Sequence, residues 1–165
     1  MSGMYMSKRE QIETAIALAS HHHKGQVDKS GMPYILHPLT VMQYVEEFVP
    51  SGDEDLLMDA RIVAILHDLL EDTVVTEVTL RYYCFEPQVI QAVVALTRSK
   101  EETYRDYIIR VSENPLATMV KLADLKHNLR PGCPDSLRAR YMNAYAYLRE
   151  QADERSSELE YVYNM

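Results

Sequence analysis

Apolar residues recur three or four positions apart along most of the chain, which is the spacing of one face of an α-helix. The first such run contains Ile12, Ala15, Ile16 and Ala19. Similar runs predict about eight helices, at roughly 7–22, 38–48, 54–70, 76–84, 87–97, 101–112, 115–129 and 136–160. Alternation of apolar and polar residues is nowhere long enough for a convincing strand. The pattern therefore predicts an all-α fold.

Capping residues and turn signals give these helices their expected boundaries. Ser7 and Glu10 have the spacing of a capping box, and Pro38 suits the first position of the second helix. The cluster RPGCPD predicts a turn before the last helix, and no linker or repeat divides the chain. We therefore expect one domain over residues 1–165, with a motif-bearing core at about 7–130 and a C-terminal helix at about 136–160.

Composition narrows the range of partners and compartments. The formal net charge of −8 disfavours a protein whose partner is a DNA or RNA polymer, because a phosphate backbone attracts a basic face. Apolar runs are shorter than the ~20 residues that span a bilayer, which disfavours a membrane partner. Cys84 and Cys133 are isolated, and the first residues lack the apolar centre of a secretory signal. A cytoplasmic location is expected.

The segment AILHDLLEDT, residues 64–73, places four ionisable side chains within six positions of an otherwise apolar helix: His67, Asp68, Glu71 and Asp72. Glu71 follows His67 by four residues, and Asp72 follows Asp68 by four, so the two members of each pair lie on neighbouring turns of one helix face. Buried imidazole and carboxylate groups cost several kcal/mol each unless they are paired or bind a metal. A solvated helix end with an acidic run is the alternative explanation.

Two further segments carry the same kinds of group. Asp124, in VKLADLKHNL, falls where the apolar pattern would bury it or place it at the edge of a pocket. His37, in YILHP, precedes Pro38 at a point where the backbone is restricted. The alternative for Asp124 is an exposed acidic residue on an amphipathic helix, and the alternative for His37 is a polar side chain at a helix cap. Together with His67 and Asp68, however, these residues offer two imidazoles and two carboxylates, a set that suits Mn²⁺, Fe²⁺ or Zn²⁺ better than Ca²⁺.

The chain resembles the HD-domain metal-dependent phosphohydrolases, and more closely the (p)ppGpp hydrolase domain of RelA/SpoT enzymes and small stand-alone alarmone hydrolases. The matching segments are AIALASHHHKGQVDKSGMPYILHP, AILHDLLEDT and VKLADLKHNLR, which occur in the family's order between residues 15 and 130. The resemblance implies a single HD-domain helical bundle with one divalent transition ion. That ion is usually Mn²⁺, with Fe²⁺, Zn²⁺, Ni²⁺ and Co²⁺ as alternatives.

The resemblance also implies roles for single residues. The implied metal ligands are His37, His67, Asp68 and Asp124. Glu71 and Asp72 match the acidic pair that activates or orients the attacking water, and Asn128 matches an asparagine near the sugar and phosphate of the substrate. His23 matches a supporting histidine. The further substrate contacts that we expect are Lys24, Asp28, Lys29, Tyr104 and Arg105.

Two positions depart from the family's pattern. Asp28 stands where the alarmone hydrolases have an arginine that packs against the guanine base, and Leu125 replaces the arginine of the motif ADR. Lys29 is retained and could reach a phosphate. An aspartate cannot supply the cation–π and stacking contact of an arginine. The implied metal ligands are thus complete, whereas the arginine that the resemblance implies for stacking on guanine is absent.

The sequence predicts a hydrolase of a small phosphorylated nucleotide, of the (p)ppGpp 3′-pyrophosphohydrolase type. Asp28 motivates a first alternative, a phosphatase or pyrophosphatase for another nucleotide or phosphorylated metabolite. A second alternative is a regulatory module that binds a nucleotide on the HD scaffold without turnover. The tyrosines and charges after residue 138 predict an outer face or a homodimer contact.

Overall fold

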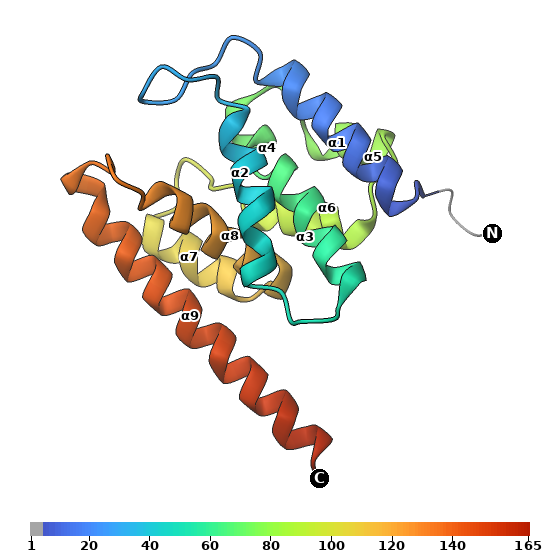
Figure 1. Cartoon of the computed structure of the whole chain (residues 1–165), viewed down its shortest axis with the longest axis vertical. Coiled ribbons are helices and arrows are strands. Elements are labelled where there is room, and N and C mark those ends of the chain that lie inside the picture. The colour runs from blue at the N-terminus through green and yellow to red at the C-terminus, as the bar shows by residue number, and fades with distance from the viewer. Residues whose placement is uncertain (1–4) are drawn as a thin grey trace.

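The computed structural model describes residues 5–165, which form an all-α domain without a β-strand (Figure 1). An isolated antiparallel bridge pairs Val27 with Pro33 in the loop after the first helix. The helices are α1 (Lys8–His22), α2 (Leu36–Tyr44), the 3₁₀ helix η1 (Val45–Glu47), α3 (Glu54–Leu66), α4 (Leu69–Asp72), α5 (Glu77–Tyr82), α6 (Pro87–Ala95), α7 (Tyr104–Ser112), α8 (Pro115–Asn128) and α9 (Asp135–Tyr163). The expected fold class is confirmed.

Helix starts follow the capping residues of the sequence. The capping box of α1 is present, since the Glu10 amide donates to the Ser7 hydroxyl and the Ser7 amide donates to the Glu10 carboxylate. Asn114 caps α8 through its side chain, which accepts from the Ala117 amide at 2.9 Å. These local signals set where α1 and α8 begin and therefore which of their residues face the core.

Helix α3 lies at the centre of the domain and packs against α1, α2, α6 and α8. Its last five residues, 62–66, are completely buried. A helix that is apolar on all sides is expected at such a position. The residues that directly follow α3 therefore emerge in the middle of the molecule, where α2 and α8 converge (Figure 1).

The predicted helix over 54–70 is interrupted at His67 and Asp68. In a continuous helix the carbonyl of Ala64 would accept from the amide of Asp68. Instead the His67 ring nitrogen Nδ1 lies 2.6 Å from that carbonyl. The side chain thus competes with the backbone for one acceptor, and α4 starts as a separate turn in which the Asp72 amide donates to the Asp68 carbonyl.

Pro38 does not occupy the first position of its helix, because α2 already begins at Leu36. His37 consequently lies inside the first turn instead of preceding it, and its amide donates to the Tyr34 carbonyl at 2.9 Å. A proline is tolerated there, since the first amides of a helix have no partner within the helix.

Helix α9 covers α7 and α8 and then continues beyond the body of the domain (Figure 1). Leu148 of α9 is fully buried, whereas Leu159, three turns further along the same helix, is 55% exposed. The predicted C-terminal helix is present and is longer than expected. No helix within residues 5–165 has the length and apolar content that crossing a membrane requires.

Candidate metal centre

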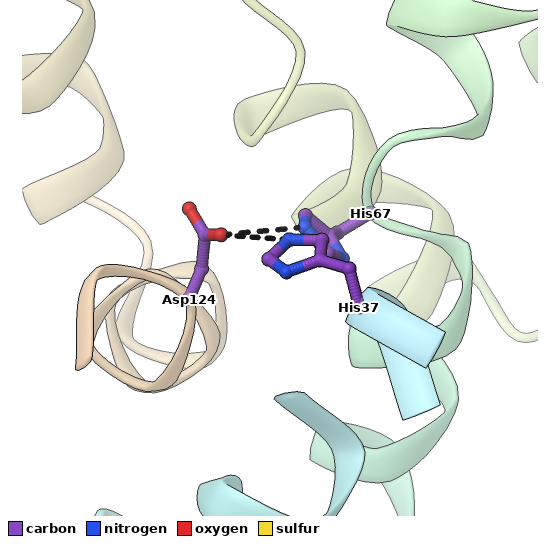
Figure 2. Close-up of side chains that lie close together, drawn as sticks. All are labelled: His37, His67 and Asp124. Carbon is purple, nitrogen blue, oxygen red and sulfur yellow. Dashed lines mark ion pairs between the residues drawn. The ribbon is translucent and has the colours of Figure 1, made fainter. Parts of the chain in front are cut away.

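Two imidazoles and one carboxylate converge in the interior of the domain (Figure 2). His37 comes from α2, His67 from the turn after α3, and Asp124 from α8. All three residues are buried, and each offers one ligand atom within 4.8 Å of the others. The Asp124 oxygen Oδ1 lies 3.0 Å from His37 Nε2 and 3.8 Å from His67 Nε2. Residues 87 positions apart in the chain thus meet at one point.

Asp68, the fourth expected ligand, lies against both imidazoles. Its Oδ2 atom is 3.0 Å from His67 Nε2 and 3.6 Å from His37 Nε2. The hydroxyl of Tyr34 donates to the same oxygen at 2.5 Å. Tyr34 therefore orients Asp68 from the loop before α2, a role that no sequence pattern predicted.

The chemistry of these groups fits a divalent cation. Ligand atoms about 2.0–2.2 Å from one ion lie roughly 3.0–3.6 Å from one another. Three of the four nitrogen–oxygen distances, 3.0 to 3.6 Å, fall within that spacing, and the fourth, from His67 Nε2 to Asp124 Oδ1, is 3.8 Å. Among residues 5–165, moreover, buried His67 Nε2 makes no hydrogen bond. An orphaned buried acceptor is costly without a partner, and a cation would supply one.

The carboxylates are held in the ionised form that a metal ligand needs. Burial acts to raise the pKa of Asp68, but His67 outweighs it and lowers that pKa to about 2. Burial also acts to raise the pKa of Asp124, which Lys121 and the two histidines hold well below its ordinary value. Burial acts to lower the pKa of His67, yet the two carboxylates raise it well above its ordinary value. Protons and a metal ion therefore compete for this site.

Two side chains of α8 fix the orientation of Asp124. Lys121 Nζ lies 2.7 Å from its Oδ2 atom, and the Asn128 amide donates to its Oδ1 atom at 2.8 Å. Asn128, which we expected at the substrate, thus also orients Asp124. Lys121 was missed by the sequence reasoning, although its i,i+3 spacing from Asp124 was a usable signal.

A cavity of about 550 Å³ opens above these ligands. Its lining includes His37, Asp68, Asp124 and Asn128, together with four further expected residues: Asp28, Lys29, Glu71 and Asp72. The Glu71 carboxylate accepts from the Arg98 amide at 2.7 Å and so holds the loop after α6. Desolvation raises the pKa of Asp72, and nearby Asp68 and Glu71 add to the rise. A carboxyl group with a raised pKa beside a cluster of this kind is a candidate for proton exchange.

The turn at 28–32 carries the residue that departs from the family's pattern. The Asp28 oxygen Oδ1 accepts from the amides of Ser30 at 2.8 Å and Met32 at 3.0 Å. Its other oxygen lies 3.6 Å from Arg130 Nη2, across the mouth of the cavity. Asp28 thus shapes its own turn and holds an arginine that comes from the end of α8.

Three expected substrate contacts lie outside this cavity. Tyr104 and Arg105 line a separate groove between α7 and α9. The residue of α7 that contacts Lys121 is Tyr107, one turn further along the helix. Lys24 is exposed on the turn after α1 and does not line the cavity. His23 is buried, and its Nδ1 lies 2.8 Å from the Gln26 side chain, which in turn donates to the Asp72 carbonyl.

Comparisons with known sequences agree with this arrangement. The family model described as HD domain matches residues 15–115, a range that ends before Asp124. The chain is 34% identical over 132 residues to a protein of Streptomyces coelicolor named GTP pyrophosphokinase, covering 75% of this chain and 15% of that protein. It is 32% identical over 133 residues to the guanosine-3′,5′-bis(diphosphate) 3′-pyrophosphohydrolase of Aquifex aeolicus, covering 76% and 18%. The chain therefore spans less than a fifth of either relative.

A solved structure has the same fold. It is described as "A metazoan ortholog of SpoT hydrolyzes ppGpp and plays a role in starvation responses". The two chains superpose with a TM-score of 0.66, over 91% of this chain and 88% of that one, at 23% sequence identity. This likeness establishes the helical architecture that brings α2, α3 and α8 together.

Proposed function

Because the chain belongs to the HD-domain family, we propose that it is a metal-dependent phosphohydrolase that removes pyrophosphate from the 3′ position of guanosine 3′,5′-bis(diphosphate). The observation that carries the proposal is the convergence of His37, His67 and Asp124 beneath an open cavity. The name of the Aquifex aeolicus relative supports the substrate class. Of the divalent ions, we propose Mn²⁺, which suits a mixture of imidazole and carboxylate ligands.

The residues of the cavity supply the other requirements of hydrolysis. A divalent ion held by His37, His67, Asp68 and Asp124 would polarise a phosphoryl oxygen and lower the pKa of water. Asp72 accepts the proton of the water that attacks the 3′-diphosphate, since its raised pKa matches a group that takes up and returns protons. The Lys29 ammonium, on the rim, neutralises phosphate charge.

The direct test is to incubate Mn²⁺-loaded protein with ppGpp and to quantify GDP and pyrophosphate. We expect stoichiometric release of both, and none from a His67→Ala variant. Metal analysis of the purified protein accompanies this assay, and about one tightly held transition ion per chain is expected. A wild-type preparation that holds its metal but releases no more product than His67→Ala would refute the substrate assignment.

The position of Asp28 supports a second candidate function, which is the hydrolysis of a different phosphorylated nucleotide. Its carboxylate is engaged by the turn amides and by Arg130, so that no cation stands free at this position to stack on guanine. A panel of adenine, guanine and pyrimidine nucleotides, assayed for phosphate and pyrophosphate, separates the two candidates. Faster turnover of a non-guanine nucleotide than of ppGpp would favour the second. We place either activity in the cytoplasm, which is consistent with two free cysteines.

A further inference from the structure

His37 can bind a cation through Nε2 only if its proton is on the other ring nitrogen. Nε2 faces Asp124 Oδ1 at 3.0 Å, which is the side of the proposed metal. Nδ1 lies 2.7 Å from Nδ1 of His127, with the two rings stacked at a centroid distance of 4.9 Å. A neutral imidazole has one donor and one acceptor nitrogen. For His37 to offer its Nε2 lone pair, its Nδ1–H must donate a hydrogen bond that Nδ1 of His127 accepts.

The other histidine of the centre has no such ambiguity. His67 Nδ1 lies 2.6 Å from the backbone carbonyl of Ala64, and a carbonyl can only accept a hydrogen bond. The fold itself therefore places the proton of His67 on Nδ1. His127 is different, because an imidazole nitrogen can donate as well as accept, and the pair of rings alone leaves two arrangements open.

Arg130 removes this ambiguity. Its Nη1 lies 3.4 Å from His127 Nδ1 and donates to the His127 carbonyl at 2.9 Å. A guanidinium has five donors and no acceptor, so a nitrogen that faces it is stabilised as an acceptor. The proton of His127 is then on Nε2.

Arg130 is itself held from the other side of the cavity. Its Nη2 lies 3.6 Å from Oδ2 of Asp28, and the turn at 28–32 fixes that aspartate. The residue that departs from the family's pattern is thereby connected to a metal ligand through two side chains. A solvent-accessible pair of this kind contributes little energy, and its effect is to orient the guanidinium.

We propose that His127 is a positioning residue which, oriented by Arg130 and Asp28, keeps the proton of His37 on Nδ1 and leaves Nε2 free to bind a divalent cation. The proposal rests on the proposed function, because it requires a metal at His37. Outer partners of this kind typically change metal affinity 10–100-fold.

The protonation states can be measured without any activity assay. Nitrogen-15 chemical shifts of the histidine rings report which nitrogen carries the proton, in metal-free protein and in protein loaded with diamagnetic Zn²⁺. We expect the His127 proton on Nε2 in both forms, and the His37 proton on Nδ1 in the Zn²⁺ form. A proton on His127 Nδ1 in the Zn²⁺ form would overturn the proposal.

A matched pair of variants distinguishes the hydrogen-bond acceptor of His127 from the stacking of its ring on His37. His127→Phe keeps a ring to stack on His37 but has no acceptor, whereas the side-chain oxygen of His127→Asn can take the place of Nδ1. We expect Zn²⁺ to dissociate about 10–100-fold more readily from His127→Phe and to be largely recovered by His127→Asn, as measured by competition with a chelator. Equal affinity of His127→Phe and wild type would refute the role, as would equal losses in both variants.

Arg130→Met tests the contact between Arg130 and His127. It removes the donor but keeps a side chain of similar length, so His127 becomes free to take either tautomer. We expect a loss of Zn²⁺ affinity of a few-fold and a mixture of His127 tautomers in the nitrogen-15 spectrum. An unchanged single tautomer would contradict the part assigned to Arg130. A wild-type protein that binds Zn²⁺ with these tautomers but turns over no nucleotide would refute the proposed function. The role of His127 in positioning His37 would still hold.

Discussion

The floor and the rim of the cavity are built in different ways. The floor is the set of groups that converge on one point: His37, His67, Asp68 and Asp124. The rim is the turn at the mouth and the arginine that faces it: Asp28, Lys29 and Arg130. Floor side chains are at most 18% exposed, whereas Arg130 is 42% exposed. Of the two positions that depart from the pattern of the resembling family, Asp28 lies on the rim and Leu125 is buried in α8.

Burial explains why the two regions differ in what they tolerate. On the floor each charge depends on a neighbour, so removing one group leaves another unpaired at a cost of about 3–5 kcal/mol. On the rim, water screens the charges, and an ion pair contributes about 0–1 kcal/mol. A rim can therefore change its sequence and its ligand preference while the floor stays intact. We therefore expect substitutions on the floor to have the largest effects on metal binding and activity, and substitutions on the rim and the outer surface to have smaller ones.

The largest effect is expected from Asp124→Ala on the floor. The change removes a ligand atom that adjoins both imidazoles, and it leaves mostly buried Lys121 without its counter-charge. We expect metal binding and phosphohydrolase activity to be lost together, and stability to fall by about 3–5 kcal/mol. Metal analysis, nucleotide turnover and denaturant unfolding measure the three quantities.

Asp124→Asn is the matched control for folding. Its amide oxygen still accepts from Lys121, so the stability loss is expected to be smaller than for alanine, whereas the charge that attracts the metal is gone. A folded Asp124→Asn variant that keeps full metal content and activity would contradict the assignment of this carboxylate to the floor.

Asp72→Asn is expected to rank second, because it removes a proton acceptor and spares the ligands. We expect kcat to fall about 10²–10⁴-fold with the metal retained. Desolvation raises the pKa of Asp72, so the basic form is lost as the pH falls through that raised value. The acid limb of the wild-type kcat/KM profile should therefore lie above the pH of an ordinary aspartate, about 3.9, and should disappear in Asp72→Asn.

Glu71→Gln is the comparison that makes this result specific. Glu71 holds the Arg98 amide, and a glutamine oxygen can accept the same hydrogen bond. We expect a much smaller change in kcat than for Asp72→Asn and an unchanged acid limb. Equal losses in the two variants would show that the acidic pair acts as a unit.

Sequence reasoning found the floor because its residues break a pattern. Ionisable groups within apolar helical runs are conspicuous, and His67, Asp68 and Asp124 stand out for that reason. Their supports were not predicted, since Tyr34 reaches Asp68 across 34 residues and His127 reaches His37 across 90. Such contacts depend on how the helices pack, which helical periodicity does not specify.

The same limit explains where the observed helices and cavity lining differ from those expected. A sequence pattern could not show that the His67 side chain would take the Ala64 carbonyl and interrupt the predicted helix. Nor could it show which face of α7 meets the cavity, so that Tyr104 and Arg105 were expected at the substrate and lie in another groove. Capping residues, by contrast, act within one turn, and those of α1 and α8 are where they were predicted.

Asp28→Arg on the rim should have a smaller effect, mainly on substrate preference, with at most a few-fold change in metal affinity through the loss of the contact to Arg130. A cation–π contact at an exposed site contributes about 0.5–1 kcal/mol, which corresponds to a roughly two- to five-fold lower KM for a guanine nucleotide. We expect kcat to change little. Asp28→Asn is the control, since its oxygen can still accept from the Ser30 and Met32 amides while it adds no cation. A change in kcat without a change in KM would contradict the division between floor and rim.

The smallest effect is expected from His21→Ala, although His21 belongs to the most conspicuous histidines of the sequence. Successive helical residues point about 100° apart, so the triplet at 21–23 cannot converge on one ion. His23 turns inward to Gln26, and His21 is exposed at the end of α1. We expect stability within about 0.5 kcal/mol of wild type and unchanged metal content and turnover. Loss of metal from His21→Ala, with His37→Ala unaffected, would move the ligand set from the floor to the surface.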